Sequence, residues 1–275
     1  MRLISVLAVL AGCAGIAAPA WAQPAPGTVV LDPAPDIAGV IGGGTRPEVV
    51  VSGLKSADDP IWLPGIGLVF SESQANRVVR LDERDRVTTF VGDLPGPLGM
   101  TFDRQGRLIS LQTRPGLAGP RVIWPAGQEK IIADRFEGRP FGRPNDIVSD
   151  RSGGLYFSDL GPRPTPPGAL SPAVYYVPPG GAPMRVADDI ARPNGLGLSR
   201  DEKTLYVNDT GGIHAYAFDV RPDGRLANRR VFITYVGRDR SIPATDPPVS
   251  NADGLVLDDE GRLYALTEAG IEVAS

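Results

Sequence analysis

The feature of this chain that most constrains its fold is an internal repeat that begins near Pro47. Strand-like segments recur along the sequence, and each begins at a leucine. Successive leucines are 40, 47, 50 and 58 residues apart, and they are Leu68, Leu108, Leu155, Leu205 and Leu263. A turn precedes each of them, and three of these turns share the form Asp-x-x-Gly, at 103–106, 150–153 and 258–261. Aspartate starts such turns through its side chain, and glycine accepts a positive φ. A period in the forties with several short strands per unit is typical of a β-propeller blade.

Composition supports an all-β fold and excludes several classes of site. The chain has 34 glycines and 28 prolines among 275 residues, but 42% of its residues are hydrophobic, so many turns connect short strands around a core. A plain β-sandwich would not need such similar units. One cysteine and one histidine exclude an internal disulfide, a multi-cysteine zinc site and multi-histidine metal sites. A net charge of −4 argues against general nucleic-acid binding.

The first residues resemble an export signal. Arg2 precedes an apolar stretch that runs to Ala18, and Ala20-Trp-Ala22 fits a small-x-small cleavage site. We therefore expect a signal peptide at 1–22, a flexible linker at 23–43 and a propeller domain at 44–275. The protein is then exported to the periplasm and has no stable membrane span. Two alternatives are disfavoured: a membrane anchor, for which the stretch is short, and lipidation of Cys13, which only twelve residues precede.

Polar residues occupy one equivalent position in four of the five units. This position lies ten residues before the leading leucine, or eleven where the turn is one residue longer, and it holds Asp58, Asn145, Asn194 and Asp253, with Leu98 as the exception. In a propeller the first strand of each blade lines the central channel, so these side chains should converge on the axis. Oxygen ligands without His or Cys favour Ca²⁺, Mg²⁺ or Mn²⁺. The alternative is that Asp and Asn simply start strands and turns here.

Several segments, in this order and spacing, resemble the regucalcin/gluconolactonase family of six-bladed propellers. The similarity extends over about residues 47–274, and its motifs are Asp58-Asp-Pro-Ile-Trp62, Thr101-Phe-Asp-Arg-Gln-Gly-Arg-Leu108, Arg143-Pro-Asn-Asp146 with Tyr156-Phe-Ser-Asp159, Arg192-Pro-Asn-Gly-Leu196 with Leu205-Tyr-Val-Asn-Asp209, and Ala252-Asp-Gly-Leu255.

The resemblance implies a lactonase with a divalent cation on the propeller axis, most commonly Ca²⁺, with Mg²⁺, Mn²⁺ or Zn²⁺ as alternatives. It implies metal ligands at Asp58, Asn194 and Asp253, with Asp253 also the general base. Asn145 corresponds to a residue that contacts the substrate or metal-bound water, and Arg143 to one that contacts the substrate. The predicted partner is a small lactone, and we expect a monomer.

The sequence departs from this pattern in four places. Asp58 stands where the family has Glu, and Asp59 stands where it has Gly. The proline-rich stretch 161–172 does not match sugar-binding members. The fifth unit is the last in the sequence, so we expect the sixth blade to be missing or incomplete by about 40 residues.

Two other functions stay open: a phosphotriester hydrolase of the same architecture, and a propeller that binds a ligand without chemistry. A serine-hydrolase triad is not expected, because Ser158 and Ser250 lack a histidine partner and His214 is interpreted as structural. Trp62 and Tyr156 alternate with apolar neighbours and are predicted to lie in the blade core.

Overall fold

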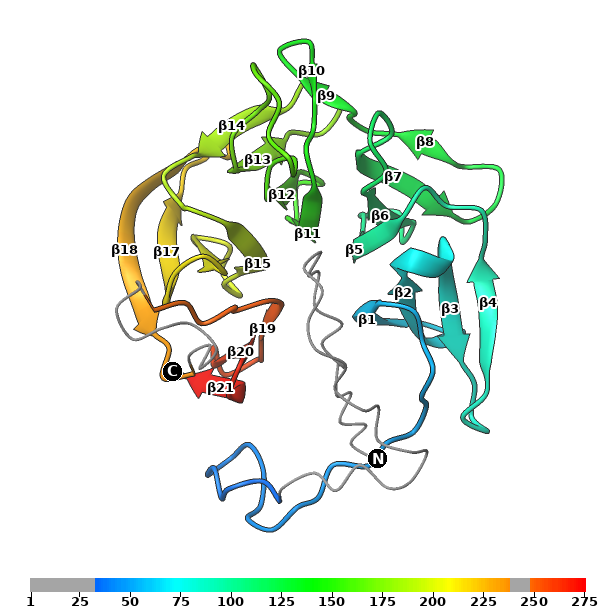
Figure 1. Ribbon diagram of the computed structural model, residues 1–275, viewed down its shortest axis with the longest axis vertical. Coiled ribbons are helices and arrows are strands. Elements are labelled where there is room, and N and C mark those ends of the chain that lie inside the picture. The colour runs from blue at the N-terminus through cyan, green and yellow to red at the C-terminus, as the bar shows by residue number, and fades with distance from the viewer. Residues whose placement is uncertain (1–32, 238–247) are drawn as a thin grey trace.

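The computed structural model describes residues 33–237 and 248–275, and in this part of the chain five sheets surround a common centre (Figure 1). Four sheets have four strands and the fifth has three. Within each sheet the strands follow one another in chain order and pair antiparallel, which is the meander of a propeller blade. The prediction of an all-β propeller is confirmed.

The five sheets are called blades 1 to 5 in chain order. Blade 1 holds β1 (Ala57–Leu63), β2 (Gly67–Glu72), β3 (Arg77–Leu81) and β4 (Val87–Val91); blade 2 holds β5 (Pro97–Phe102), β6 (Leu108–Gln112), β7 (Gly119–Trp124) and β8 (Lys130–Ile131). Blade 3 holds β11 (Pro144–Ser149), β12 (Leu155–Asp159), β13 (Ala173–Val177) and β14 (Met184–Ala187); blade 4 holds β15 (Pro193–Leu198), β16 (Thr204–Asp209), β17 (His214–Val220) and β18 (Leu226–Thr234). Blade 5 holds β19 (Leu255–Leu257), β20 (Leu263–Thr267) and β21 (Gly270–Ala274). A short 3₁₀ turn, η1 (Ser73–Ala75), and the small sheet of β9 (Arg135–Phe136) and β10 (Arg139–Pro140) lie between these strands.

The leading leucines found in the sequence all lie at or next to the start of the second strand of a blade. The first strands, β1, β5, β11, β15 and β19, are the innermost (Figure 1). In blades 1 to 4 the pairing of the first two strands is interrupted by a bulge at the same place, near the start of the first strand. A bulge re-aims the side chains beside it, so one repeated irregularity determines which residues reach the axis.

The core lies between neighbouring blades rather than within one sheet. Four clusters of buried apolar side chains join blades 1 and 2, 2 and 3, 3 and 4, and 4 and 5. Tyr156 belongs to one of them and has no exposed surface, as predicted. The prediction for Trp62 is wrong, because 60% of its surface is exposed. Its neighbours Ile61 and Leu63 pack against blade 2, and alternation along β1 turns Trp62 to the opposite face.

Residues before blade 1 form a closed loop within the described part. The Ala34 and Gly44 amides exchange backbone hydrogen bonds with Thr45 and Ala34, at 2.7 and 3.0 Å, and Ile37 bridges Ile41. The segment 33–56, blue in Figure 1, runs from beside blade 5 to β1. The predicted signal peptide at 1–22, including Cys13, lies outside the described residues. Within those residues, no helix is long and apolar enough to cross a bilayer.

Candidate functional site

The candidate site lies where the first strands begin, at the inner edge of the ring. The register of the first two strands agrees with the count made from the leading leucines. The residue before each predicted position pairs with the last residue of the second strand, as in Ala57↔Glu72, Pro144↔Asp159 and Pro193↔Asp209. Asp58, Asn145 and Asn194 therefore occupy the same place in three blades. Asp253 lies two residues before β19, in the corresponding place of blade 5.

Three of the four predicted metal ligands interact with one another. The Asn194 side chain lies close enough to the Asp253 carboxyl to lower its pKa. Asp58 is close enough to Asp253 for the two carboxylates to repel each other. Blade 4 also holds the Asp253 backbone, because its carbonyl accepts hydrogen bonds from Asn208 Nδ2 at 2.7 Å and the Gly195 amide at 3.2 Å. Among the described residues, no hydrogen bond joins the Asn145 side chain to these groups, so its part in the site remains a prediction.

Burial dominates the electrostatics of these carboxyls. Protein atoms surround Asp58 on most sides, and this burial, together with the charge of Asp253, raises the Asp58 pKa to about 7, although the Asp59 amide donates to it at 2.9 Å. Burial likewise raises the pKa of Asp253, and the nearby Asn194 side chain opposes this rise. Ionising both carboxyls is energetically unfavourable unless a positive charge lies beside them.

Two further carboxylates adjoin the site, and the sequence motifs contained them without showing what they do. Asp59 accepts a hydrogen bond from the Met100 amide of blade 2. Asp146 accepts from the Leu196 amide of blade 4 at 2.6 Å and from the Ile147 amide at 2.7 Å. Each therefore ties the first strand of its own blade to the first strand of the next.

The pKa values of Asp59 and Asp146 are also raised. Burial, followed by the charges of Asp146 and Asp58, holds the pKa of Asp59 well above its usual range. Burial raises the pKa of Asp146 to about 7, against the stabilising Leu196 and Ile147 amides, and the charges of Asp58 and Asp253 add to the rise. The axis therefore carries four partly buried carboxyls whose charges affect one another.

The position that Asp59 holds in blade 1 and Asp146 holds in blade 3 is glycine in the other blades. A Cβ on Gly99 would lie 2.6 Å from the Asn145 carbonyl oxygen, and a Cβ on Gly195 would collide with the Asp253 carbonyl. In blades 2 and 4 the absence of a side chain thus allows the next blade to approach closely. Aspartate in blades 1 and 3 instead reaches across to the next blade.

Buried carboxylates at the ends of the second strands hold the loops that lead into the site. Asp159 accepts hydrogen bonds from the Gly142, Arg143 and Gly161 amides at 2.7–2.8 Å. The Arg143 Nε donates to the Gly161 carbonyl at 2.9 Å. Arg143, the predicted substrate contact, is thus held beside the start of β11, and its role toward a substrate remains a prediction.

The donor set suits a hard divalent cation. Asn194 is buried, and its Oδ1 has no hydrogen-bond partner among the described residues. A buried carbonyl oxygen without a donor fits a metal ligand. In the described part of the chain no three His, Cys, Asp or Glu side chains are grouped as a metal site. A site here therefore depends on amide oxygens as well as on Asp58 and Asp253.

The side chains considered for a serine-hydrolase triad make other hydrogen bonds. His214 Nδ1 is 3.0 Å from the Thr234 hydroxyl, on the paired strands β17 and β18. The buried Ser158 hydroxyl accepts from the Asp146 amide at 3.1 Å. Among the described residues, neither side chain is hydrogen-bonded into a Ser-His-Asp arrangement.

Fold and site together define a β-propeller with an oxygen-rich, carboxylate-lined axial site. The chain belongs to the SMP-30/Gluconolactonase/LRE-like family, whose model matches residues 58–274. It is 25% identical over 271 residues to a gluconolactonase of Zymomonas mobilis, covering 87% of this chain and 72% of that protein. It is 23% identical to pentonolactonase XacC of Haloferax volcanii, covering 80% of this chain and 69% of that one. Among solved structures, a gluconolactonase of Xanthomonas campestris superposes with a TM-score of 0.69 at 27% identity, covering 82% and 74% of the two chains.

Proposed function

We propose that this protein is an exported, metal-dependent hydrolase that opens a lactone, with a divalent cation, preferably Ca²⁺, bound by Asp58, Asn194 and Asp253. The reaction class rests on family membership and on lactonases among its relatives. The proposal of a metal site is supported by one observation: two carboxyls with raised pKa values and one amide oxygen without a hydrogen-bond partner lie together at the axis.

Each residue has a distinct task in this proposal. When bound, the cation supplies a Lewis acid for the lactone carbonyl and neutralises buried carboxylates. Asp253 accepts a proton from the attacking water, and its raised pKa brings its basicity nearer to neutral pH. The C–O bond of the ring then breaks, and the same proton returns to the departing ring oxygen, which leaves as a hydroxyl. Arg143 and Asn145 donate hydrogen bonds that orient the substrate.

The test is hydrolysis of glucono-δ-lactone, followed by proton release, in buffer, in EDTA and after addition of Ca²⁺. We expect EDTA to abolish activity and Ca²⁺ to restore it. Asp253→Asn should lower kcat by about 10²–10⁴-fold, whereas Asp258→Asn, at the other end of β19, should leave it unchanged. Activity that survives both EDTA and Asp253→Asn would overturn the mechanism. A phosphotriester is run in parallel, and faster hydrolysis of that compound would contradict the assignment of a lactone.

Export and oligomeric state need separate measurements. Expression in a bacterial host followed by fractionation should place the protein in the periplasm, with Gln23 as the first residue. Recovery in the cytoplasm with Met1 intact would contradict export. Size-exclusion chromatography coupled to light scattering should give the mass of a monomer.

A further inference from the structure

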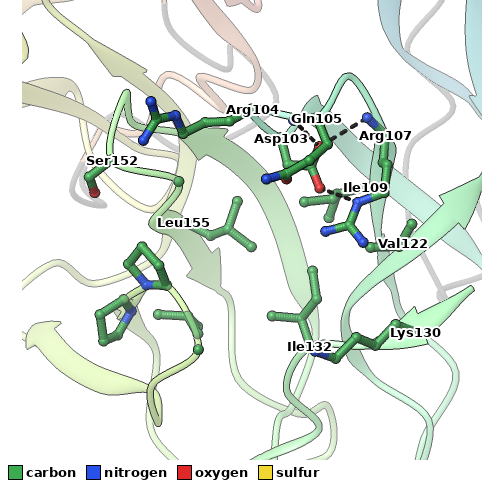
Figure 2. Close-up of a pocket in the computed structure, with 15 residues that line it drawn as sticks. Asp103, Arg104, Gln105, Arg107, Ile109, Val122, Lys130, Ile132, Ser152 and Leu155 are labelled. Carbon is green, nitrogen blue, oxygen red and sulfur yellow. Dashed lines mark hydrogen bonds and ion pairs between the residues drawn. The ribbon is translucent and has the colours of Figure 1, made fainter. Parts of the chain in front are cut away.

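A cavity of about 320 Å³ lies between blades 2 and 3, away from the axial site (Figure 2). It is bordered by three turns at the ends of β5, β11 and β13, which contain Asp103, Ser152 and Pro179. The candidate site lies at the beginnings of the first strands, so the cavity is on the opposite face of the ring. Nothing in the proposed lactone chemistry uses it.

The repeat explains why the cavity exists here. Between blades 3 and 4, the corresponding slot is filled by the paired residues Tyr156 and Tyr176, whose ring centroids are 4.4 Å apart. The Tyr156 hydroxyl donates to the Gly224 carbonyl at 2.8 Å, closing the slot against blade 4. In blade 2 the equivalent pair is Ile109 and Val122. Two aliphatic side chains replace two aromatic ones, and the missing ring volume remains as the cavity.

The floor of the cavity is apolar, because Ile109, Val122, Leu155 and Val177 line it. These four side chains are no more than 3% exposed and belong to the cluster that joins the two blades. The floor is therefore a fixed surface of the core rather than a set of mobile side chains. An apolar body of a ligand would find a preformed surface there.

The charged groups around the cavity are mostly positive. Arg104, Arg107 and Lys130 line it together with one carboxylate, Asp103. Arg107 Nε is paired with Asp103 Oδ2 at 2.6 Å, beside the cavity in Figure 2. In the described residues, neither Arg104 nor Lys130 makes an ion pair or a side-chain hydrogen bond, and both are exposed. Arg104 and Lys130 lie at opposite edges of the cavity in Figure 2, so an anion in the mouth would have a cation on either side.

We propose that this slot binds a small organic carboxylate, with its apolar body against Ile109, Val122 and Leu155 and its carboxylate facing Arg104 and Lys130. An apolar floor with a cationic rim selects for both parts of such a ligand. A neutral molecule would leave the cations unused, and a hydrophilic anion would leave the floor in contact with water.

The proposal is tested by calorimetric titration of the full chain with hexanoate, beside hexan-1-ol and gluconate. Hexanoate should bind at one site, and the neutral alcohol and the polar acid should bind at least about tenfold more weakly. The double variant Arg104→Gln/Lys130→Gln should weaken hexanoate about tenfold or more. Arg84→Gln, which changes an exposed arginine in a turn of blade 1, is the matched control and should bind as the parent does.

A second variant fills the slot as blade 3 does. Ile109→Tyr restores the ring that blade 3 carries at this place and should abolish hexanoate binding while EDTA-sensitive lactone hydrolysis persists. If Ile109→Tyr fails to fold, as judged by circular dichroism, the binding measured with Arg104→Gln/Lys130→Gln still tests the proposal. Equal binding of hexanoate and hexan-1-ol, or unchanged binding in Arg104→Gln/Lys130→Gln, would overturn the proposal.

Discussion

The two ends of the first strands use aspartate in opposite ways, and β19 shows both within six residues. At its start, burial raises the pKa of Asp253. At its end, Asp258 has a pKa lowered to about 2, because hydrogen bonds from Arg262 and Tyr264 outweigh its desolvation. The same type of side chain thus lacks a positive partner on one face of the ring and is paired with an arginine on the other.

This difference in pairing distinguishes aspartates that stabilise turns from aspartates that we assign to the functional site. The Asp258 turn recurs after β5 in blade 2 and after the third strand, β3, in blade 1, where Asp103 and Asp82 also accept backbone amides and pair with an arginine four residues later. Those carboxylates stabilise turns and need no further partner. The axial carboxyls instead oppose folding as anions, which is why the proposed function places a cation among them.

The largest expected effect comes from removing the unpaired axial oxygen. Asn194→Leu keeps the size of the side chain but deletes a ligand, so we expect Ca²⁺ affinity to fall by about 100-fold or more. Isothermal titration calorimetry measures the affinity, and thermal unfolding in EDTA checks that the fold persists. Asn194→Asp keeps an oxygen at this place and should retain binding. Unchanged affinity in Asn194→Leu would remove Asn194 from the site.

The next effect is the pH dependence of stability without metal. The folded pKa values of Asp58 and Asp146, both about 7, lie above the ordinary aspartate value of 3.8. The native state therefore holds protons that the unfolded chain releases, so this stability is complete below pH 4 and is lost as pH rises through about 7. Each group contributes a slope of at most about 1.4 kcal/mol per pH unit in that window.

Urea unfolding of EDTA-treated protein between pH 5 and 8 measures this slope. Asp82 and Asp258 do not contribute, since their lowered pKa values act only below pH 4. Excess Ca²⁺ should remove the loss of stability at high pH, because the cation binds the ionised carboxylates. A free energy of unfolding that rises from pH 5 to 8 in EDTA would contradict the buried-carboxyl description.

Much of this arrangement was predictable, because a repeat shows both its strands and its equivalent positions. The leading leucines and Asp-x-x-Gly turns identified the blades, and the count from them brought Asp58, Asn194 and Asp253 together. The link from Asp59 to the Met100 amide was not predictable, since it depends on a bulge and on a φ of 49° at Asp59. Trp62 was misassigned because alternation alone does not say which face has a neighbour. The cavity emerged only when Ile109 and Tyr156 could be compared in space.

A smaller change should follow from Asp59→Asn. The amide keeps an acceptor for the Met100 amide but removes a charge between Asp58 and Asp146. We expect the metal-free protein to gain stability at pH 8 and Ca²⁺ affinity to fall by about tenfold or less. Asp85→Asn is the control, because Asp85 also has a positive φ, of 57°, but is exposed in a turn. Lower metal-free stability in Asp59→Asn than in the control would contradict this account.

The smallest expected effect is at the filled slot of the opposite face. Tyr156→Phe keeps the ring between blades 3 and 4 but removes the hydroxyl that donates to the Gly224 carbonyl at 2.8 Å. The loss of one buried hydrogen bond should lower the free energy of unfolding by about 1 kcal/mol, while Ca²⁺ affinity and lactone hydrolysis stay unchanged. If the two faces are independent, Tyr156→Phe and Asn194→Leu should also have additive effects on stability in EDTA, because the residues share no partner. Non-additivity beyond about 0.5 kcal/mol would show that the axial site and the outer slots are coupled through blade 4.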